Sequence, residues 1–135
     1  MQRSDLSGVW RLVAFDDLGS GGERLEGPLG PDPRGLLIYS TDGHMSVSLM
    51  RTAASTRPPS TPVPLDFMGY AGTWRIDGDR VVHRVGITHT PRLKDKDEVR
   101  EVHLEGGHLS LFGTVPAGDR QLRRVLEWNR AGEGV

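Results

Sequence analysis

Cysteine is absent from this sequence of 135 residues, and its absence excludes several kinds of chemistry. Disulfide bonds, thiolate metal sites and cysteine nucleophiles all require a thiol. A chain without cysteine fits a reducing compartment, so we expect the protein in the cytoplasm. The opening MQRSDLSGVW has no apolar run of a secretory signal, and no segment approaches the roughly 18 apolar residues of a membrane span. We therefore expect a soluble protein with no membrane partner.

The chain also lacks an excess of charge and the common catalytic motifs. Its formal net charge is −1 at pH 7, which gives no reason to expect nucleic acid as a partner. The five histidines show no HxH or HExxH spacing. Neither a GxSxG elbow nor a glycine-rich loop between a strand and a helix is present. We therefore expect no bound metal and no cofactor.

Glycine and proline are frequent, with 18 and 9 residues, and they divide the chain into short segments. Alternating apolar and polar residues lie between them, as is typical of β-strands in an all-β sandwich or barrel. One short helix is expected near residues 64–70, where Pro64 and Asp66 provide a start. The expected strands are Val9–Asp16, Leu36–Ser40, His44–Met50, Gly72–Ile76, Arg80–His89, Glu98–Leu104, His108–Thr114 and Gln121–Asn129.

Two longer segments, 18–34 and 51–64, are rich in turn-forming residues. The first contains GSGG and PDPRG, and the second carries four prolines among serines and threonines. Neither segment separates parts that are large enough to fold alone, so we expect flexible loops within one domain that spans residues 1–135. Whether these loops act as lids is left open.

A tight hairpin is predicted at the sequence IDGD, residues 76–79. A two-residue loop pairs even-numbered residues before it with odd-numbered residues after it, and the apolar set must face the interior. This register places His83 inside the protein, close to Trp74, and His89 at the far end of the strand, near the rim. The residues on the inner face are Trp74, Ile76, Val81, His83, Val85 and Ile87.

A second hairpin is predicted at HLEGGHLSL, residues 103–111, with its two glycines as the loop. Leu104 then lies opposite Leu109 on the inner face. Extending this face backwards in steps of two residues places Arg100 inside as well. The outer, polar face includes His103 and His108.

Eight antiparallel strands linked mostly by hairpins would leave exposed edges, and closure into a barrel removes them. We therefore predict an all-β, eight-stranded antiparallel up-and-down barrel. A barrel of this size is either filled by side chains or holds one small ligand. The predicted interior is apolar with a few polar groups, which favours a ligand pocket.

His83 is one of two candidate catalytic residues. An imidazole has an ordinary pKa of about 6.5, so it is suited to general acid or base catalysis, or to donating a hydrogen bond to a carbonyl or enolate. The alternative is a buried histidine that is satisfied by a backbone or tyrosine partner.

Arg100 is the second candidate. A buried, unpaired charge costs several kcal/mol, so an inward arginine requires a carboxylate, a ligand anion or an exit to the barrel mouth. No acidic residue is assigned to the predicted inner faces. Extension of the side chain to the rim of the barrel is the alternative to a functional role.

Four stretches resemble the lipocalin-like domain proteins of bacteria and fungi: SGVWRLVAF, GLLIYSTDGHMSVSLM, DFMGYAGTWRIDGDRVVHRV and the closing LEWNR. The resemblance covers nearly the whole chain, in order. Gly8-Val9-Trp10 is similar to the G-x-W of lipocalins, in which a late arginine packs over the tryptophan; Arg124 or Arg130 would fill this role, and we favour Arg124. The resemblance implies an up-and-down barrel with a small-molecule cavity. It implies no single reaction, although some barrels of this kind are cyclases or isomerases in natural-product pathways.

The expected partner is a hydrophobic small molecule, held by side chains for which ordinary core packing is the alternative role. Among them, tyrosine is able both to pack and to form hydrogen bonds. Our first hypothesis is a cofactor-independent cyclase or isomerase for a polyketide- or terpenoid-like intermediate of natural-product biosynthesis, in which His83 and Arg100 move protons or polarise a carbonyl. The second is a non-catalytic carrier, and the third is a filled structural barrel. Either a monomer or a homodimer is expected. The expected binding residues are Tyr39, Met45, Val47, Tyr70, Trp74, Val85, Arg124 and Trp128.

Overall fold

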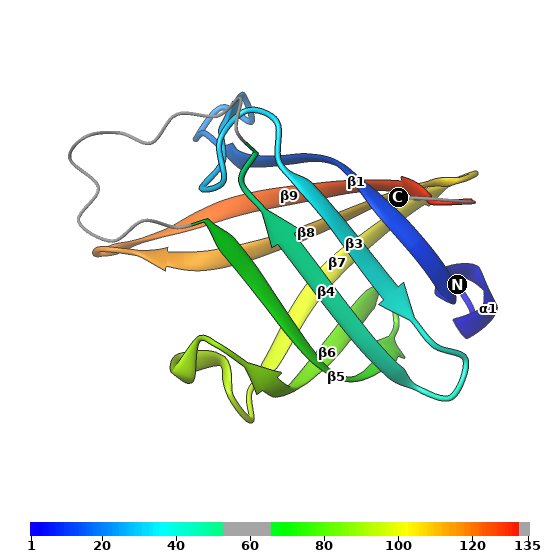
Figure 1. Cartoon of the computed structure of the whole chain (residues 1–135). Helices are drawn as coiled ribbons and strands as arrows, with labels where there is room; N and C mark the ends of the chain where they lie inside the picture. Colours follow the sequence, from blue (N-terminus) through cyan, green and yellow to red (C-terminus); the bar gives the residue numbers. More distant parts are fainter. Residues whose placement is uncertain (53–65, 133–135) are drawn as a thin grey trace.

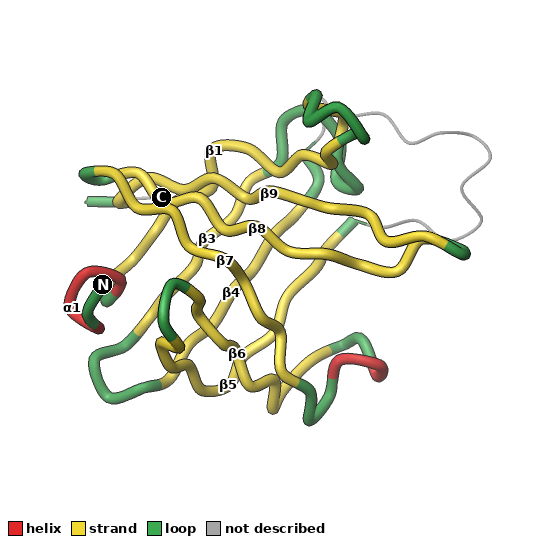
Figure 2. The backbone as a smooth tube through the Cα atoms, turned by 180° about the vertical axis from the view of Figure 1, so that it is seen from behind, coloured by secondary structure: helices red, strands yellow, loops and turns green. Residues whose placement is uncertain are grey.

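The computed structural model describes residues 1–52 and 66–132, and most of these residues lie in β-strands (Figure 1). Alternation of apolar and polar residues explains this content, since it suits strands with one buried face. Two very short helices, α1 (Arg3–Leu6) and the 3₁₀ turn η1 (Pro91–Leu93), lie at opposite ends of the molecule (Figures 1 and 2). The strands are β1 (Gly8–Leu18), β2 (Arg24–Glu26), β3 (Arg34–Tyr39), β4 (His44–Met50), β5 (Phe67–Asp77), β6 (Arg80–Thr88), β7 (Asp97–Glu105), β8 (His108–Ala117) and β9 (Arg120–Arg130).

The strands form one antiparallel sheet that closes on itself. Their order is β2-β1-β3-β4-β5-β6-β7-β8-β9, and β1 also pairs with β9. The short β2 lies outside the closed ring, where it pairs with the last residues of β1. The prediction of an eight-stranded up-and-down barrel is therefore confirmed, with β2 as an additional strand within the segment 18–34.

The predicted helix near residues 64–70 is wrong where the structure describes it. Phe67 begins β5, which pairs with β4 from Phe67↔Met50 through Tyr70↔Val47. This pairing requires an extended backbone, which is incompatible with the dihedral angles of a helix. Residues 64 and 65 lie outside the described residues.

Both predicted hairpin registers are confirmed. Trp74 pairs with His83, and Leu104 pairs with Leu109. The inward prediction for Ile87 is wrong, because a register shift in the β5–β6 ladder turns this side chain outwards, where it is 75% exposed. At the bulge the two backbones approach so closely that a Cβ on Gly72 would collide with the carbonyl of Arg84.

One end of the barrel is closed by α1 and by the residues around it, which we call the sealed end. Leu6 of α1 is fully buried, and its carbonyl oxygen accepts a hydrogen bond of 2.8 Å from Trp10 Nε1. The guanidinium of Arg130 lies 4.0 Å from the Trp10 ring centroid and donates to the carbonyl oxygens of Asp5 and Ser7. Arg130, not Arg124 as favoured from the sequence, therefore covers Trp10. The reason is the register of β9, which pairs Arg130 directly with Trp10.

The predicted loop 18–34 is packed against the barrel over part of its length. It contains β2, and Leu29, which follows β2, is fully buried in the core. The segment is therefore fixed by hydrophobic burial as well as by strand pairing. Most of the other predicted loop, 51–64, lies outside the described residues.

Candidate functional site

The barrel encloses a cavity of about 420 Å³, which falls within the usual range for small-molecule sites. Thr90, Arg92 and Leu93 line the cavity, which therefore lies towards η1. Figure 1 shows α1 of the sealed end at the other end of the molecule. The side chains that the structure describes therefore leave part of the barrel interior empty. Apolar lining side chains come from both sides of the barrel, and they are Phe15, Pro28, Leu37, Val47, Leu49, Met68, Leu93, Leu111, Val115, Pro116, Leu126 and Trp128.

Two tyrosines and a histidine form a hydrogen-bonded chain that ends at the cavity. His83 on β6 is 2% exposed, and its Nε2 lies 2.6 Å from the hydroxyl of Tyr39 on β3. Its Nδ1 lies 2.6 Å from the hydroxyl of Tyr70 on β5. Tyr70 and His83 line the cavity, whereas Tyr39 lies deeper, against the ring of Trp74 at 4.6 Å. Both ring nitrogens of His83 are thus satisfied by tyrosines, as in the alternative stated for it above.

Burial keeps the imidazole and both phenols neutral. Desolvation, helped by the positive charge of Arg100, lowers the pKa of His83 to about 3. Burial also raises the pKa of Tyr70 to about 12, although Arg100 opposes this rise, and it raises the pKa of Tyr39 well above the ordinary value. At neutral pH the chain therefore holds one imidazole proton and two phenol protons.

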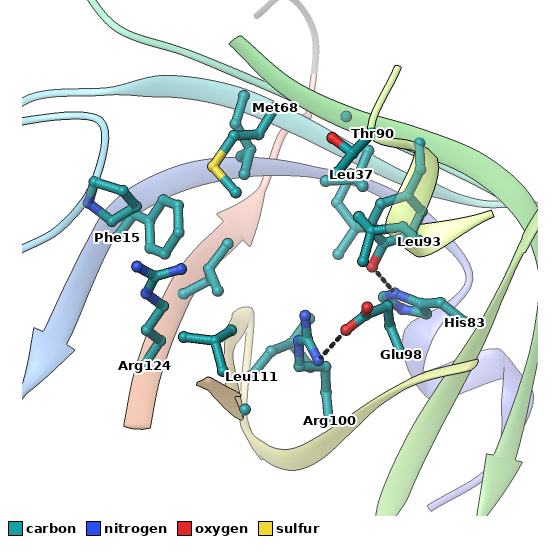
Figure 3. Close-up of a pocket in the computed structure, with 18 of the residues that line it drawn as sticks. Phe15, Leu37, Met68, His83, Thr90, Leu93, Glu98, Arg100, Leu111 and Arg124 are labelled. Carbon is teal, nitrogen blue, oxygen red and sulfur yellow. Dashed lines mark hydrogen bonds and ion pairs between the residues drawn. The ribbon is translucent and has the colours of Figure 1, made fainter. Parts of the chain in front are cut away.

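Arg100 faces the cavity and is paired with a carboxylate on its own strand. Its Nη1 donates to Glu98 Oε2 at 3.1 Å and to the Val99 carbonyl at 3.0 Å (Figure 3). The two side chains are 16% and 18% exposed, so the ion pair is largely shielded from solvent. Gly113 on β8 leaves room for this arginine, since a Cβ there would lie 2.9 Å from Arg100 Cδ. Of the ways to satisfy an inward arginine, the structure uses the carboxylate.

Arg124 on β9 lies on the same wall of the cavity as Arg100, because it pairs with Gly113 of β8, beside which Arg100 lies. Its Nε donates to Asp17 Oδ1 at 2.7 Å, and its guanidinium lies 5.8 Å from the Phe15 ring centroid. Both charges of this pair are about 80% shielded, with 20% and 17% of each side chain exposed. This wall of the cavity therefore carries two arginines, and each is paired with a carboxylate.

Trp128 contributes its ring to the cavity wall, but its indole nitrogen contributes nothing to recognition. The residue is 1% exposed, and Nε1 is covered. Among the side chains that the structure describes, this is the one buried nitrogen or oxygen without a hydrogen-bond partner. An unpaired buried donor costs stability, so this position is energetically unlike the other two tryptophans.

The predicted site residues separate into two groups. Tyr39, Met45, Trp74 and Val85 lie in the buried core and do not line the cavity. His89 follows the end of β6, where it is exposed. The predicted residues that line the cavity are His83, Arg100, Val47, Tyr70, Arg124 and Trp128.

Glu98 is the site residue that the sequence reasoning missed, because the inner faces were assigned no acidic residue. It occupies the same face of β7 as Arg100, two positions earlier, and lines the cavity. The alternation that placed Arg100 inside also places Glu98 inside, and this signal was sufficient to find it. The apolar wall from Leu37, Met68 and Leu111 was likewise not assigned to binding.

Neither a metal cluster nor a membrane helix is found in the part of the chain that the structure describes. No group of three or more histidine, aspartate or glutamate side chains within residues 1–52 and 66–132 is arranged to hold a metal ion. No helix among the same residues is long and apolar enough to cross a membrane.

Comparison with models of known protein families agrees with this architecture. A family model described as a lipocalin-like domain matches residues 7–131. A search of the curated proteins found no match. Among solved structures, the chain is similar to one titled "REP1-NXSQ fatty acid transporter", with 14% sequence identity and a TM-score of 0.42 over 97% of this chain and 99% of that chain.

Proposed function

The chain belongs to the lipocalin-like domain family, and on this premise we propose that the protein binds a hydrophobic small molecule inside its barrel. The observation that carries the proposal is the cavity of about 420 Å³ within a closed barrel. Its wall is mostly apolar, and its polar groups are gathered at a few positions, as in sites that bury most of a small ligand. Burial of apolar ligand surface would supply the driving force.

We further propose that the bound molecule is a polyketide- or terpenoid-like intermediate that is cyclised or isomerised without a cofactor. A closed cavity favours such reactions by holding a flexible molecule in one reactive conformer and by excluding water. Arg100 and the phenol–imidazole chain lie where they would polarise a carbonyl of the ligand. Because the pKa of His83 is about 3, the histidine would act through hydrogen bonds and not as an imidazolium acid.

The alternative function is a carrier that holds the same class of molecule unchanged. Its support is the pairing of the charged groups near the cavity. Arg100 is paired with Glu98, and Arg124 is paired with Asp17. Neutralised groups of this kind suit a binding site, and they leave fewer charges available to stabilise a transition state.

Binding is tested with the neutral fluorescent probe N-phenyl-1-naphthylamine. We expect saturable binding to the wild type and its loss in the double variant Val47→Trp/Leu111→Trp, which fills the cavity from β4 and β8. The matched control is Val13→Trp, because Val13 points outwards and is 47% exposed. Equal binding by the filled and control variants would refute the cavity as the binding site.

Catalysis is separated from carriage by mass spectrometry of the ligand that copurifies with the protein from its native host. Cyclisation and isomerisation conserve mass. If the protein is an enzyme and the recovered ligand is its precursor, incubation should convert this ligand into a species of equal mass and different retention time. Recovery of one unchanged species after prolonged incubation with fresh protein would support the carrier. If the protein is an enzyme, Arg100→Met should slow the conversion. If it is a carrier, the same species should be recovered from Arg100→Met as from the wild type.

A further inference from the structure

The hydrogen-bonded chain Tyr39–His83–Tyr70 has a direction, and the direction follows from counting protons. A neutral imidazole donates from one ring nitrogen and accepts at the other. His83 has a phenol on each side, at 2.6 Å from Nε2 and 2.6 Å from Nδ1. One tyrosine must therefore donate to the ring, while the other accepts from it and keeps its own proton for a third group.

Tyr39 is the tyrosine that has no acceptor for its proton other than His83 in the part of the chain that the structure describes. It is 1% exposed, and His83 is its one hydrogen-bond partner among the described residues. If Tyr39 accepted from His83, its own proton would be buried without an acceptor, which proteins avoid. Tyr39 therefore donates to Nε2, the proton of His83 resides on Nδ1, and Nδ1 donates to the hydroxyl oxygen of Tyr70.

We infer that the Tyr70 hydroxyl is the hydrogen-bond donor that the cavity presents to its ligand. Tyr39 and His83 are positioning residues that fix the direction of this donor. The ligand carries a carbonyl-type acceptor oxygen on an apolar body. This inference rests on the proposed small-molecule binding. Tyr70 lines the cavity, so its proton points towards the space in which the ligand would lie. The Nδ1–H of His83 donates to the phenol oxygen of Tyr70 and leaves the phenol proton for the ligand.

The charged neighbours favour the same class of ligand. Arg100 and Glu98 on β7 are the charged groups that act on the Tyr70 phenol, and they are paired with each other at 3.1 Å. Glu98 accepts from Arg100 at Oε2 and keeps Oε1 as an acceptor, and Arg100 has further N–H groups besides the Nη1 that it uses. With the Tyr70 hydroxyl, the N–H groups of Arg100 supply donors that suit a ketone, ester or enolate oxygen.

The direction of the chain is tested by ¹⁵N NMR of the histidine rings in the unliganded protein. We expect His83 as the neutral Nδ1–H tautomer at every pH from 5 to 8, with no titration in this range. In Tyr39→Phe the donor to Nε2 is lost, so the Nε2–H tautomer should become populated; a purely structural role of Tyr39 would not change the tautomer. An Nε2–H tautomer or an imidazolium in the wild type would overturn the inference.

The ligand class is tested with two probes of similar shape, 2-acetylnaphthalene and 2-isopropenylnaphthalene, of which only the first has an acceptor oxygen. Tyr70→Phe should weaken binding of the ketone by roughly 3- to 10-fold and leave the hydrocarbon unchanged, because the hydrogen bond to the ligand is lost for the ketone alone, whereas the bond from His83 to Tyr70 is lost with either probe. In the wild type the carbonyl stretch of the bound ketone should move to lower wavenumber, and this shift should disappear in Tyr70→Phe.

These probes distinguish failure of the inference from failure of the proposed function. If neither probe binds to the wild type, the proposed binding function is wrong. If both bind and Tyr70→Phe affects them equally, binding stands and the donor role of Tyr70 is overturned. Tyr39→Phe serves as the intermediate variant, with a smaller loss for the ketone and none for the hydrocarbon.

Discussion

The two ends of the barrel satisfy their polar side chains in different ways. At the sealed end, side-chain N–H groups donate to backbone carbonyl oxygens: Trp10 to Leu6, Trp74 to Ser40, and Arg130 to Ser7. Around the cavity, polar side chains bond mainly to one another, in the chain Tyr39–His83–Tyr70 and in the ion pairs of Arg100 and Arg124. We call the group formed by Tyr39, Tyr70, His83, Glu98 and Arg100 the polar cluster.

This difference separates stability from recognition. A carbonyl of the backbone is held by the strands and turns, so a bond to it fixes a side chain for as long as the fold exists. A bond between two side chains leaves donors and acceptors that a ligand is able to use, as the hydroxyl of Tyr70 illustrates. We therefore expect substitutions at the sealed end to affect unfolding most, and substitutions in the polar cluster to affect unfolding less and binding more.

The largest expected effect is at the sealed end. Trp10→Ala removes a fully buried ring, its hydrogen bond to Leu6 and the surface over which Arg130 lies. We expect a loss of about 3–5 kcal/mol in the free energy of unfolding, measured by urea denaturation. Val13→Ala on the outer face of β1 is the control and should cost much less. A loss below about 1 kcal/mol for Trp10→Ala would contradict the assignment of stability to this end.

The ion pair of the polar cluster provides the next effect. Arg100→Met leaves Glu98 largely buried without its partner, and we expect a loss of about 2 kcal/mol in the free energy of unfolding. The double variant Arg100→Met/Glu98→Leu removes both charges and should recover most of that loss. Chemical denaturation of the two variants and the wild type measures the difference. A double variant that is less stable than the single one would show that the pair itself holds the barrel together.

The contrast between the sealed end and the polar cluster was predictable only in part. Contacts between residues close in the sequence were predictable, and contacts between distant residues were not. Alternation and the two hairpin loops are local, and they placed His83 beside Trp74 and Arg100 inside. The contact of His83 with Tyr39 joins residues 44 positions apart on β3 and β6, and depends on how the barrel curves. No pattern within one strand carries that information.

Two errors concern the register between neighbouring strands. Ile87 was placed inside because strict alternation was assumed, whereas a bulge in the β5–β6 ladder reverses the faces beyond it. Arg124 was favoured over Arg130 for the position above Trp10 because the register between the first and last strands has no hairpin to define it. Closure of the barrel sets that register, and closure is a property of all the strands together.

Acid stability should reveal the buried imidazole of the polar cluster. The pKa of His83 is about 3 in the fold and about 6.5 in an unfolded chain, so the unfolded state alone takes up this proton as the pH falls below 6.5. The stabilisation is present above pH 6.5 and is lost progressively towards pH 3. Between pH 7 and 5 the wild type should lose about 2 kcal/mol from this group.

The control for this effect is His83→Gln, which removes the titrating group and keeps a hydrogen-bonding side chain. The surface residue His108, whose pKa is raised through its bonds to Asn129 and Glu127, titrates in both proteins and cancels in the comparison. The measurement is the free energy of unfolding at pH 7, 6 and 5 for both proteins. Parallel pH profiles would mean that His83 is not held neutral in the fold.

The smallest expected effect is a difference between two tryptophans. The indole N–H of Trp10 has a hydrogen-bond partner, and that of Trp128 has none among the described residues. Trp10→Phe removes a donor that is bonded to the Leu6 carbonyl at 2.8 Å, whereas Trp128→Phe removes a buried donor that has no partner. Both substitutions lose similar apolar volume, and phenylalanine keeps an aromatic ring below Arg130, so the hydrogen bond is the main difference between them. We expect Trp10→Phe to be more destabilising by about 1 kcal/mol in thermal or urea unfolding. Equal losses would mean that the indole nitrogen of Trp128 also has a partner in solution, such as a buried water molecule. The difference between the sealed end and the cavity would then rest on the polar cluster alone.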